Sequence, residues 1–168
     1  MMKKILKTER DWTATIVRVT LGLIIFPHGA QKALGWFGGF GMEGTLGFFS
    51  SIGIPTVAGV LVIAAEFLGG LGLITGALSR VAAVGIAAVM AGAMVLGGHL
   101  QNGFFLNWTG GQSGEGIEFH LLVIAMALVV VIRGGGAFSI DGLFGVRAAP
   151  TADQLTTRRE REVLDRAA

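Results

Sequence analysis

The sequence of 168 residues contains no cysteine, which excludes disulfide bonds, thiolate metal sites, iron–sulfur clusters and thiol–disulfide chemistry within this chain. Charged residues are also few: they make up 14% of the chain, against about 25% in an ordinary soluble domain. The net charge is only +2, without a stripe of basic residues, which is too little for a nucleic-acid-binding protein. We therefore expect no nucleic-acid partner.

Proline is scarce, with 3 residues, whereas glycine accounts for 28 residues and the hydrophobic fraction is 52%. The glycines have no collagen-like period, and a glycine-rich linker would not reach a mean hydropathy of +0.70. These values predict a small integral membrane protein whose main partner is the lipid bilayer.

Four segments have the roughly 20 mostly apolar residues that a membrane-spanning helix needs, although the third and fourth are short. We expect these spans over residues 12–34, 55–78, 81–98 and 117–132. The predicted fold class is all-α, a four-helix transmembrane bundle over residues 12–145. A polar N-terminal segment (1–11) precedes it, and a polar tail (146–168) follows, either as a solvated end or as a short exposed helix.

Lysine and arginine are distributed asymmetrically along the chain. They gather before the first span, at Arg80 between the second and third spans, and after the fourth span, whereas residues 35–54 and 99–116 contain none. The positive-inside rule then places both termini in the cytoplasm. We expect an uncleaved first helix, because no A-x-A-like cleavage site follows and the first apolar run has full span length.

Small residues four positions apart let helices approach closely in lipid. Gly72 and Gly76 form such a pair in the second span, and alanines at every fourth residue from 83 to 91 form a row in the third. The glycines at 97–98 and 134–136 predict helix ends. No glycine cluster matches a phosphate-binding fingerprint.

Ionisable residues inside membrane spans are rare, costly and usually functional. The spans and their ends hold seven of them that bear on function: Arg18, His28, Lys32, Glu66, His99, Glu118 and His120. Helical phase puts the first three within an arc of about 80°, so this polar face must look into the bundle. Glu66 lies about 16 Å along its span, near mid-membrane, and is the natural anionic partner for that face.

Glu118 and His120 lie two residues apart, so both cannot point inward on a regular helix; we place Glu118 inside and leave His120 open. Together the inward groups predict one polar chamber that opens toward the outer leaflet and deepens to Glu66 and Arg18. The alternative is a polar network that only fixes helix register. On paper, His28, His99 and His120 could form a three-ligand metal site, and His28 and His99 a bis-histidine haem site, but we expect neither a metal nor a haem.

Aromatic residues gather in the two segments that are predicted to lie on the outer side: Trp36, Phe37, Phe40, Phe48, Phe49, Phe104, Phe105 and Trp108. This pattern is typical of an aromatic belt at the membrane interface. A second interpretation, compatible with the first, is an aromatic lid over an apolar, ring-shaped ligand, which Trp36 and Phe104 would contact.

An ordered set of short segments resembles the DoxX family of small four-span bacterial membrane proteins. The set comprises FPHGAQK at 26–32, GWFGG at 35–39, Glu66 with GGL at 69–71, the turn at 76–80, His99 with NGFF at 102–105, Gly116 with Glu118, GGG at 134–136 and SID at 139–141. The resemblance covers about residues 12–145. It implies a four-span fold and functional positions at His28, Lys32, Glu66, His99 and Glu118, whereas His120 matches no recurrent polar position.

The same resemblance implies a link to membrane redox chemistry, since the family includes a membrane subunit of a thiosulfate:quinone oxidoreductase and members linked to oxidative-stress resistance. A related branch resembles a eukaryotic cargo receptor without a redox role. Most members are uncharacterised, so the family determines the fold better than the chemistry.

Two functional hypotheses follow. In the first, the chain is a redox-associated subunit that binds a quinone: His28 or His99 and Lys32 donate to the two carbonyls, Glu66 relays protons and Arg18 balances charge. A partner protein must then supply electrons, because the chain lacks cysteine and any flavin motif. In the second, it is a membrane scaffold, or a receptor or carrier for a small molecule, without redox chemistry. We also expect a homodimer.

Overall fold

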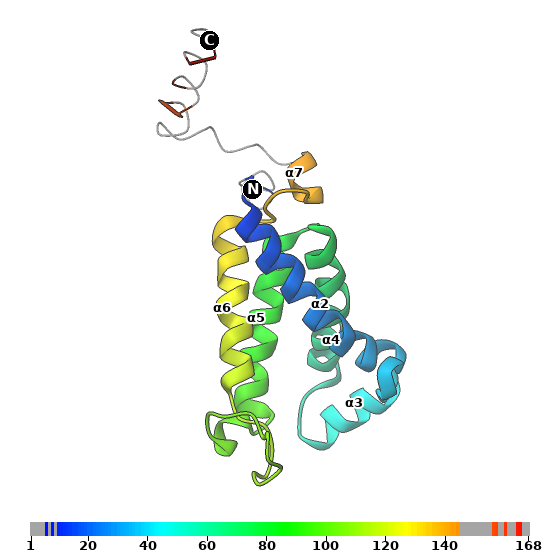
Figure 1. Cartoon of the computed structure of the whole chain (residues 1–168). Helices are drawn as coiled ribbons and strands as arrows, with labels where there is room; N and C mark the ends of the chain where they lie inside the picture. The colour runs from blue at the N-terminus through cyan, green and yellow to red at the C-terminus, as the bar shows by residue number, and fades with distance from the viewer. Residues whose placement is uncertain are drawn as a thin grey trace.

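The computed structural model describes residues 6, 8, 10–144, 156, 157, 160, 164 and 165, and over these residues it contains helices and no β-strand. Four long helices form the body of the molecule: α2 (Trp12–Leu34), α4 (Thr56–Thr75), α5 (Ser79–Leu96) and α6 (Glu118–Arg133) (Figure 1). The shorter elements are η1 (Trp36–Gly38), α3 (Gly41–Ser51), η2 (His99–Asn102) and α7 (Ile140–Phe144). Most of the predicted polar N-terminal segment and tail lies outside the described residues.

The four long helices agree with the four predicted spans to within three residues at each end, and α2 matches its predicted bounds. Three of them, α2, α4 and α5, are long and apolar enough to cross a membrane. Helix α6 has 16 residues, fewer than the roughly 20 that a span needs, so a fourth crossing and the placement of both termini in the cytoplasm stay predictions.

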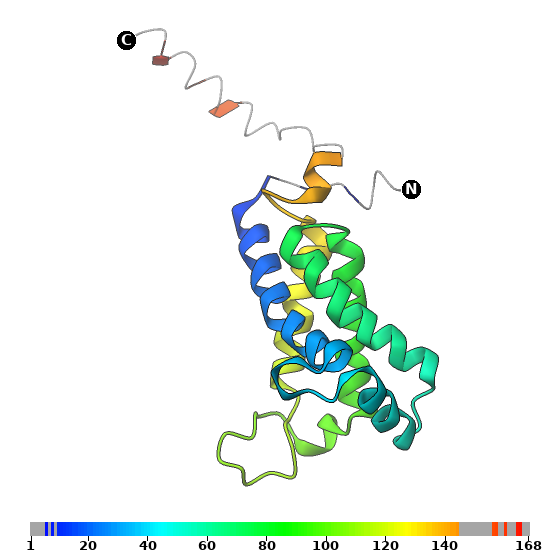
Figure 2. The same ribbon diagram turned by 90° about the vertical axis from the view of Figure 1, so that its right-hand side faces the viewer.

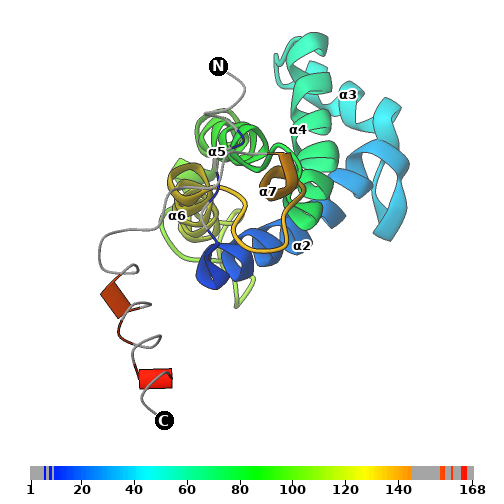
Figure 3. The same cartoon turned by 90° about the horizontal axis from the view of Figure 1, so that it is seen from above.

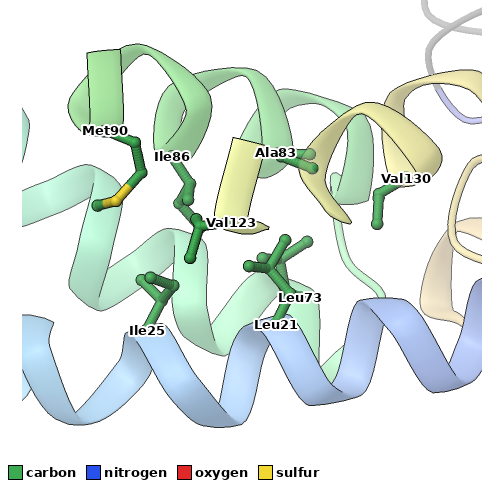
Figure 4. Close-up of a cluster of buried hydrophobic side chains, with 9 residues drawn as sticks. Leu21, Ile25, Leu73, Ala83, Ile86, Met90, Val123 and Val130 are labelled. Carbon is green, nitrogen blue, oxygen red and sulfur yellow. The ribbon is translucent and has the colours of Figure 1, made fainter. Parts of the chain in front are cut away.

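Apolar side chains from all four long helices meet in one core (Figure 4). The fully buried members include Leu21 and Ile25 on α2, Leu73 on α4, Ile86 on α5 and Val123 on α6. Many other large apolar side chains lie on the outside, as is expected where the solvent is lipid. The protein is thus a helical membrane bundle, as the composition predicts.

Glycines allow α2 and α4 to pack with their backbones almost touching. A Cβ added at Gly22 would lie 2.8 Å from the backbone nitrogen of Ile74, and one added at Gly70 would lie 2.8 Å from the Cα of Phe26. Of the predicted pair of Gly72 and Gly76, Gly72 does lie at a helix contact, because a Cβ there would be 3.7 Å from the Cβ of Ala82 on α5, but the assignment of Gly76 is wrong. Gly76 instead ends α4 with φ 75°, a left-handed conformation that favours glycine.

Helix α3 lies in the segment between the first two predicted spans, where the sequence analysis predicted no helix. Its glycines make it a weak helix former, so packing must stabilise it. Leu46 and Phe49 lie over Gly59 of α4, where a Cβ would come within 2.8 Å and 3.0 Å of their side chains. Seen from above, α3 and the adjoining half of α4 stand apart from α5 and α6 (Figure 3).

Candidate functional site

A cavity of about 880 Å³ lies between the long helices at the end of the bundle where α3 and the segment after α5 are found. Side chains of α2, α4, α5 and α6 line it, and Phe48, Phe49 and Leu106 cover it. The lining is mostly apolar, with a few polar groups: His28, Lys32, Glu66, His99, Glu115 and His120. A large apolar cavity with a few convergent polar groups is typical of a small-molecule site.

An ion pair links α2 and α4 in this cavity: Lys32 Nζ lies 2.5 Å from Glu66 Oε2. The Glu66 side chain is 5% exposed and that of Lys32 is 27% exposed. Gly29 lies one turn before Lys32, and a Cβ there would lie 2.6 Å from the carbonyl carbon of Glu66. The backbones of α2 and α4 are therefore close at this point, so the side chains of Lys32 and Glu66 span only a short distance to meet. The predicted pairing of Glu66 with the polar face of the first span is confirmed for Lys32.

His28 lies on the same side of α2 as Lys32 and also lines the cavity. Its ring packs against Phe119 of α6, with the ring centroids 6.1 Å apart. The ring of His120, the next residue along α6, lies 6.0 Å from that of Phe119. Phe119 therefore neighbours a histidine of each of two polar groups in the same cavity.

The second polar group consists of His99 and His120, whose ring centroids are 4.3 Å apart. His99 Nδ1 lies 2.8 Å from the carbonyl oxygen of Glu115, which holds this ring in place. His120 is buried, with 6% of its surface exposed, and its Nδ1 has no hydrogen bond of good geometry among the described residues, although the backbone carbonyl of Gly116, one turn earlier, interacts with the ring. A buried nitrogen that borders a cavity and lacks such a bond calls for an explanation, and a ligand is one.

The assignment of Glu118 to the interior is wrong: His120 is the inward residue. Glu118 accepts a hydrogen bond from the backbone nitrogen of Leu106, 3.3 Å away, and helps to hold the segment that precedes α6. The sequence contained the signal, because His120 has the helical phase of the buried Val123 and Ala127, whereas Glu118 does not.

Arg18 also differs from the prediction, since it does not line the cavity. It is 1% exposed and donates to backbone carbonyls: Gly135 at 2.6 Å, Ile74 at 2.9 Å, Phe138 at 3.5 Å, and Leu73. Arg18 thereby joins the end of α4 to the chain after α6. The polar chamber does not extend to it, because its long side chain points back along α2 toward the other end of the bundle.

Asp141 lies in the same polar region as Arg18, 3% exposed, at the start of the short helix α7. Its two carboxylate oxygens accept from the backbone nitrogens of Leu78, at 2.7 Å, and Ser79, at 2.8 Å. It therefore caps α5 from a distant part of the chain, which the sequence analysis missed because a cap is normally sought next to its helix.

Trp36 and Phe104, the predicted lid residues, are half exposed and do not line the cavity. Phe48 and Phe49 of α3 and Phe119 of α6 provide the aromatic lining instead. An aromatic cover thus exists, but different members of the predicted cluster contribute to it, because α3 turns them toward α4.

Comparison with known proteins gives a family and one curated relative. A family model described as DoxX matches residues 13–99. The chain is also 36% identical over 80 residues to "Putative oxidoreductase CatD" from Bacillus subtilis (strain 168), which is 48% of this chain and 55% of that protein. The chain thus spans about half the length of this relative. No solved structure matches.

Proposed function

The chain belongs to the DoxX family of membrane proteins, and on this premise we propose that it is a redox-associated membrane subunit that binds a quinone, or a similar apolar ring, in the cavity. The observation that carries the proposal is the buried Lys32–Glu66 ion pair beside His28 in an otherwise apolar cavity. Buried charges are costly to keep in a membrane protein, and they are usually found at functional sites. The volume of about 880 Å³ is adequate for a substituted quinone ring.

A quinone ring carries two oxygens that accept hydrogen bonds, and the cavity offers donors in two places. Lys32 and His28 serve one oxygen, and the His99–His120 pair serves the second. Reduction of a quinone to its quinol requires two electrons and two protons. The donors at the two oxygens supply the protons. Glu66 acts as a proton relay and returns a proton to Lys32 after Lys32 has given one up.

The electrons come from a redox partner protein, since this chain has no cysteine that could hold an iron–sulfur cluster. Similarity to a protein named as an oxidoreductase supports a redox role over the alternative, a scaffold or a small-molecule receptor.

The test is ligand identification on protein purified from native membranes, by organic extraction with mass spectrometry and by an absorbance spectrum for haem. We expect a co-purified quinone, and an upward shift of the melting temperature with decylubiquinone or menaquinone-4. The shift should disappear in Glu66→Gln and His28→Ala and persist in the control Glu43→Gln, whose carboxylate is exposed on α3. Absence of both a co-purified quinone and a shift would overturn the proposal and favour the alternative.

A further inference from the structure

Helices α4 and α5 diverge toward the end of α5. Near the turn, a Cβ added at Gly69 would lie 3.7 Å from the Cβ of Ala82, and further along, one added at Gly85 would lie 3.5 Å from the Cβ of Ala65. At Gly92, one turn before α5 ends, no atom lies within 4 Å of an added Cβ. The two helices therefore stay equally close from Gly69 to Gly85, and a gap opens beside α5 at Gly92. Figure 2 shows the ribbons of α4 and α5 diverging in this direction.

This gap is part of the cavity, because residues between 58 and 65 of α4 and between 85 and 96 of α5 line it. Its outer edge is apolar and open: Leu61 and Leu96 line the cavity and are 64% and 62% exposed. Both helices are long and apolar enough to lie in a membrane. The open edge of the cavity thus faces acyl chains of the bilayer.

The inner wall of the same cavity is polar. The Lys32–Glu66 ion pair and His28 lie there, together with His120, whose buried Nδ1 has no hydrogen bond of good geometry among the described residues. Hydrogen-bonding groups at the inner wall and an apolar edge open to lipid match a molecule with a polar head and a hydrocarbon tail.

We propose that the ligand is a lipid-soluble amphiphile that enters sideways from the bilayer between α4 and α5. Its hydrogen-bonding ring lies at the inner wall, and its hydrocarbon tail lies between residues 58–65 and 85–96. The nature of the ring rests on the proposed function, whereas the path and the tail site rest on the geometry of α4 and α5.

The test compares two quinones with the same ring, decylubiquinone and the tail-less ubiquinone-0, on the full chain in lipid nanodiscs. Gly92→Phe adds a ring where space is open, so the fold should hold, and Ala88→Phe repeats the obstruction one turn earlier. We expect the affinity for decylubiquinone to fall about tenfold in both variants, and that for ubiquinone-0 to change less than about twofold. Gly47→Phe is the matched control, since Gly47 also has no atom within 4 Å and lies outside the cavity lining.

A decylubiquinone with a diazirine at the end of its tail should label residues 58–65 or 85–96. Equal loss of both quinones, no loss of either, or label on other segments would overturn the sideways path while leaving quinone binding intact. If neither quinone binds, the proposed function fails, and a diazirine-bearing palmitic acid decides the tail site alone. Label at 85–96 would support that site, and absence of label there would overturn it.

Discussion

Lys32 of α2 and Glu66 of α4 form an ion pair of 2.5 Å where Gly29 brings the two helix backbones together. The pair lines the cavity, so a close contact between two helices also positions charged groups of the site. A substitution that separates the helices should therefore disturb the cavity as well.

The ion pair can be tested by a double-mutant cycle. We expect Lys32→Met to lower the free energy of unfolding by about 2 kcal/mol, because it leaves Glu66 buried and unpaired, and Glu66→Gln by about 1 kcal/mol, because Lys32 is partly exposed. The double variant should lose less than the sum of the two. Unfolding in mixed detergent micelles measures all four proteins, and strictly additive losses would contradict a direct interaction.

The close contact between α2 and α4 at Gly29 can be tested by adding a single methyl group at this position. Gly29→Ala should destabilise the protein by about 2–3 kcal/mol, because its Cβ would overlap the backbone of Glu66, which cannot yield as a flexible side chain can. Gly92→Ala is the matched control, since open space surrounds that position, and it should be neutral or slightly stabilising. Thermal unfolding of both variants in one detergent provides the comparison. Similar melting temperatures for the two would refute the close contact.

A substitution of His120 should affect ligand binding and stability in different ways. His120→Phe removes a buried nitrogen that has no hydrogen bond of good geometry among the described residues, so stability should stay the same or rise by about 1 kcal/mol. Quinone affinity should fall about tenfold in the same variant, because one hydrogen bond to the ligand is lost. His99→Phe is the counterpart that should lose stability, since its Nδ1 contacts the Glu115 carbonyl. A destabilised His120→Phe with unchanged affinity would show a purely structural role.

The remote cap of α5 predicts a graded series at Asp141. Asp141→Ala should cost about 1–2 kcal/mol, because the backbone nitrogens of Leu78 and Ser79 lose both acceptors, and Asp141→Asn should cost less, because one acceptor remains. Thermal unfolding measures the series, with Asp165→Ala as an exposed control in the tail. Equal effects of the Ala and Asn variants would contradict capping through two oxygens.

Because α6 is shorter than an ordinary membrane span, whether it crosses the membrane needs a direct test. An alkaline phosphatase fused after residue 148 should be inactive if α6 crosses the membrane, because the tail then lies in the cytoplasm. The same enzyme inserted at residues 109–111, in the segment before α6, should be active. An active fusion after residue 148 would show that only α2, α4 and α5 cross.

Much of the architecture could be predicted from the sequence because membrane helices follow local rules. Apolar runs fixed the four long helices to within three residues, and glycine correctly indicated the ends of α5 and α6. Helix α3 could not be predicted in this way, since its local composition disfavours a helix and packing against α2 and α4, including Gly59, stabilises it.

Within the site, helical phase and opposite charge were enough to bring Lys32 to Glu66. They failed for Arg18, because phase gives the side of a helix and not the direction in which a long side chain extends along it. Placing Glu118 inside and leaving His120 open was an error of interpretation, since the helical phase of His120 already matched the buried residues of α6.

The sequence by itself determined that this is an all-helical membrane protein of the DoxX family with charges inside its spans, because hydrophobic length and charge position are properties of the chain. Only the tertiary structure decided that Asp141 caps α5, that Gly29 brings the backbones of α2 and α4 together, and that α4 and α5 leave an apolar cavity between them. These features depend on contacts between segments that are distant in the sequence, and such contacts are a property of the packed bundle.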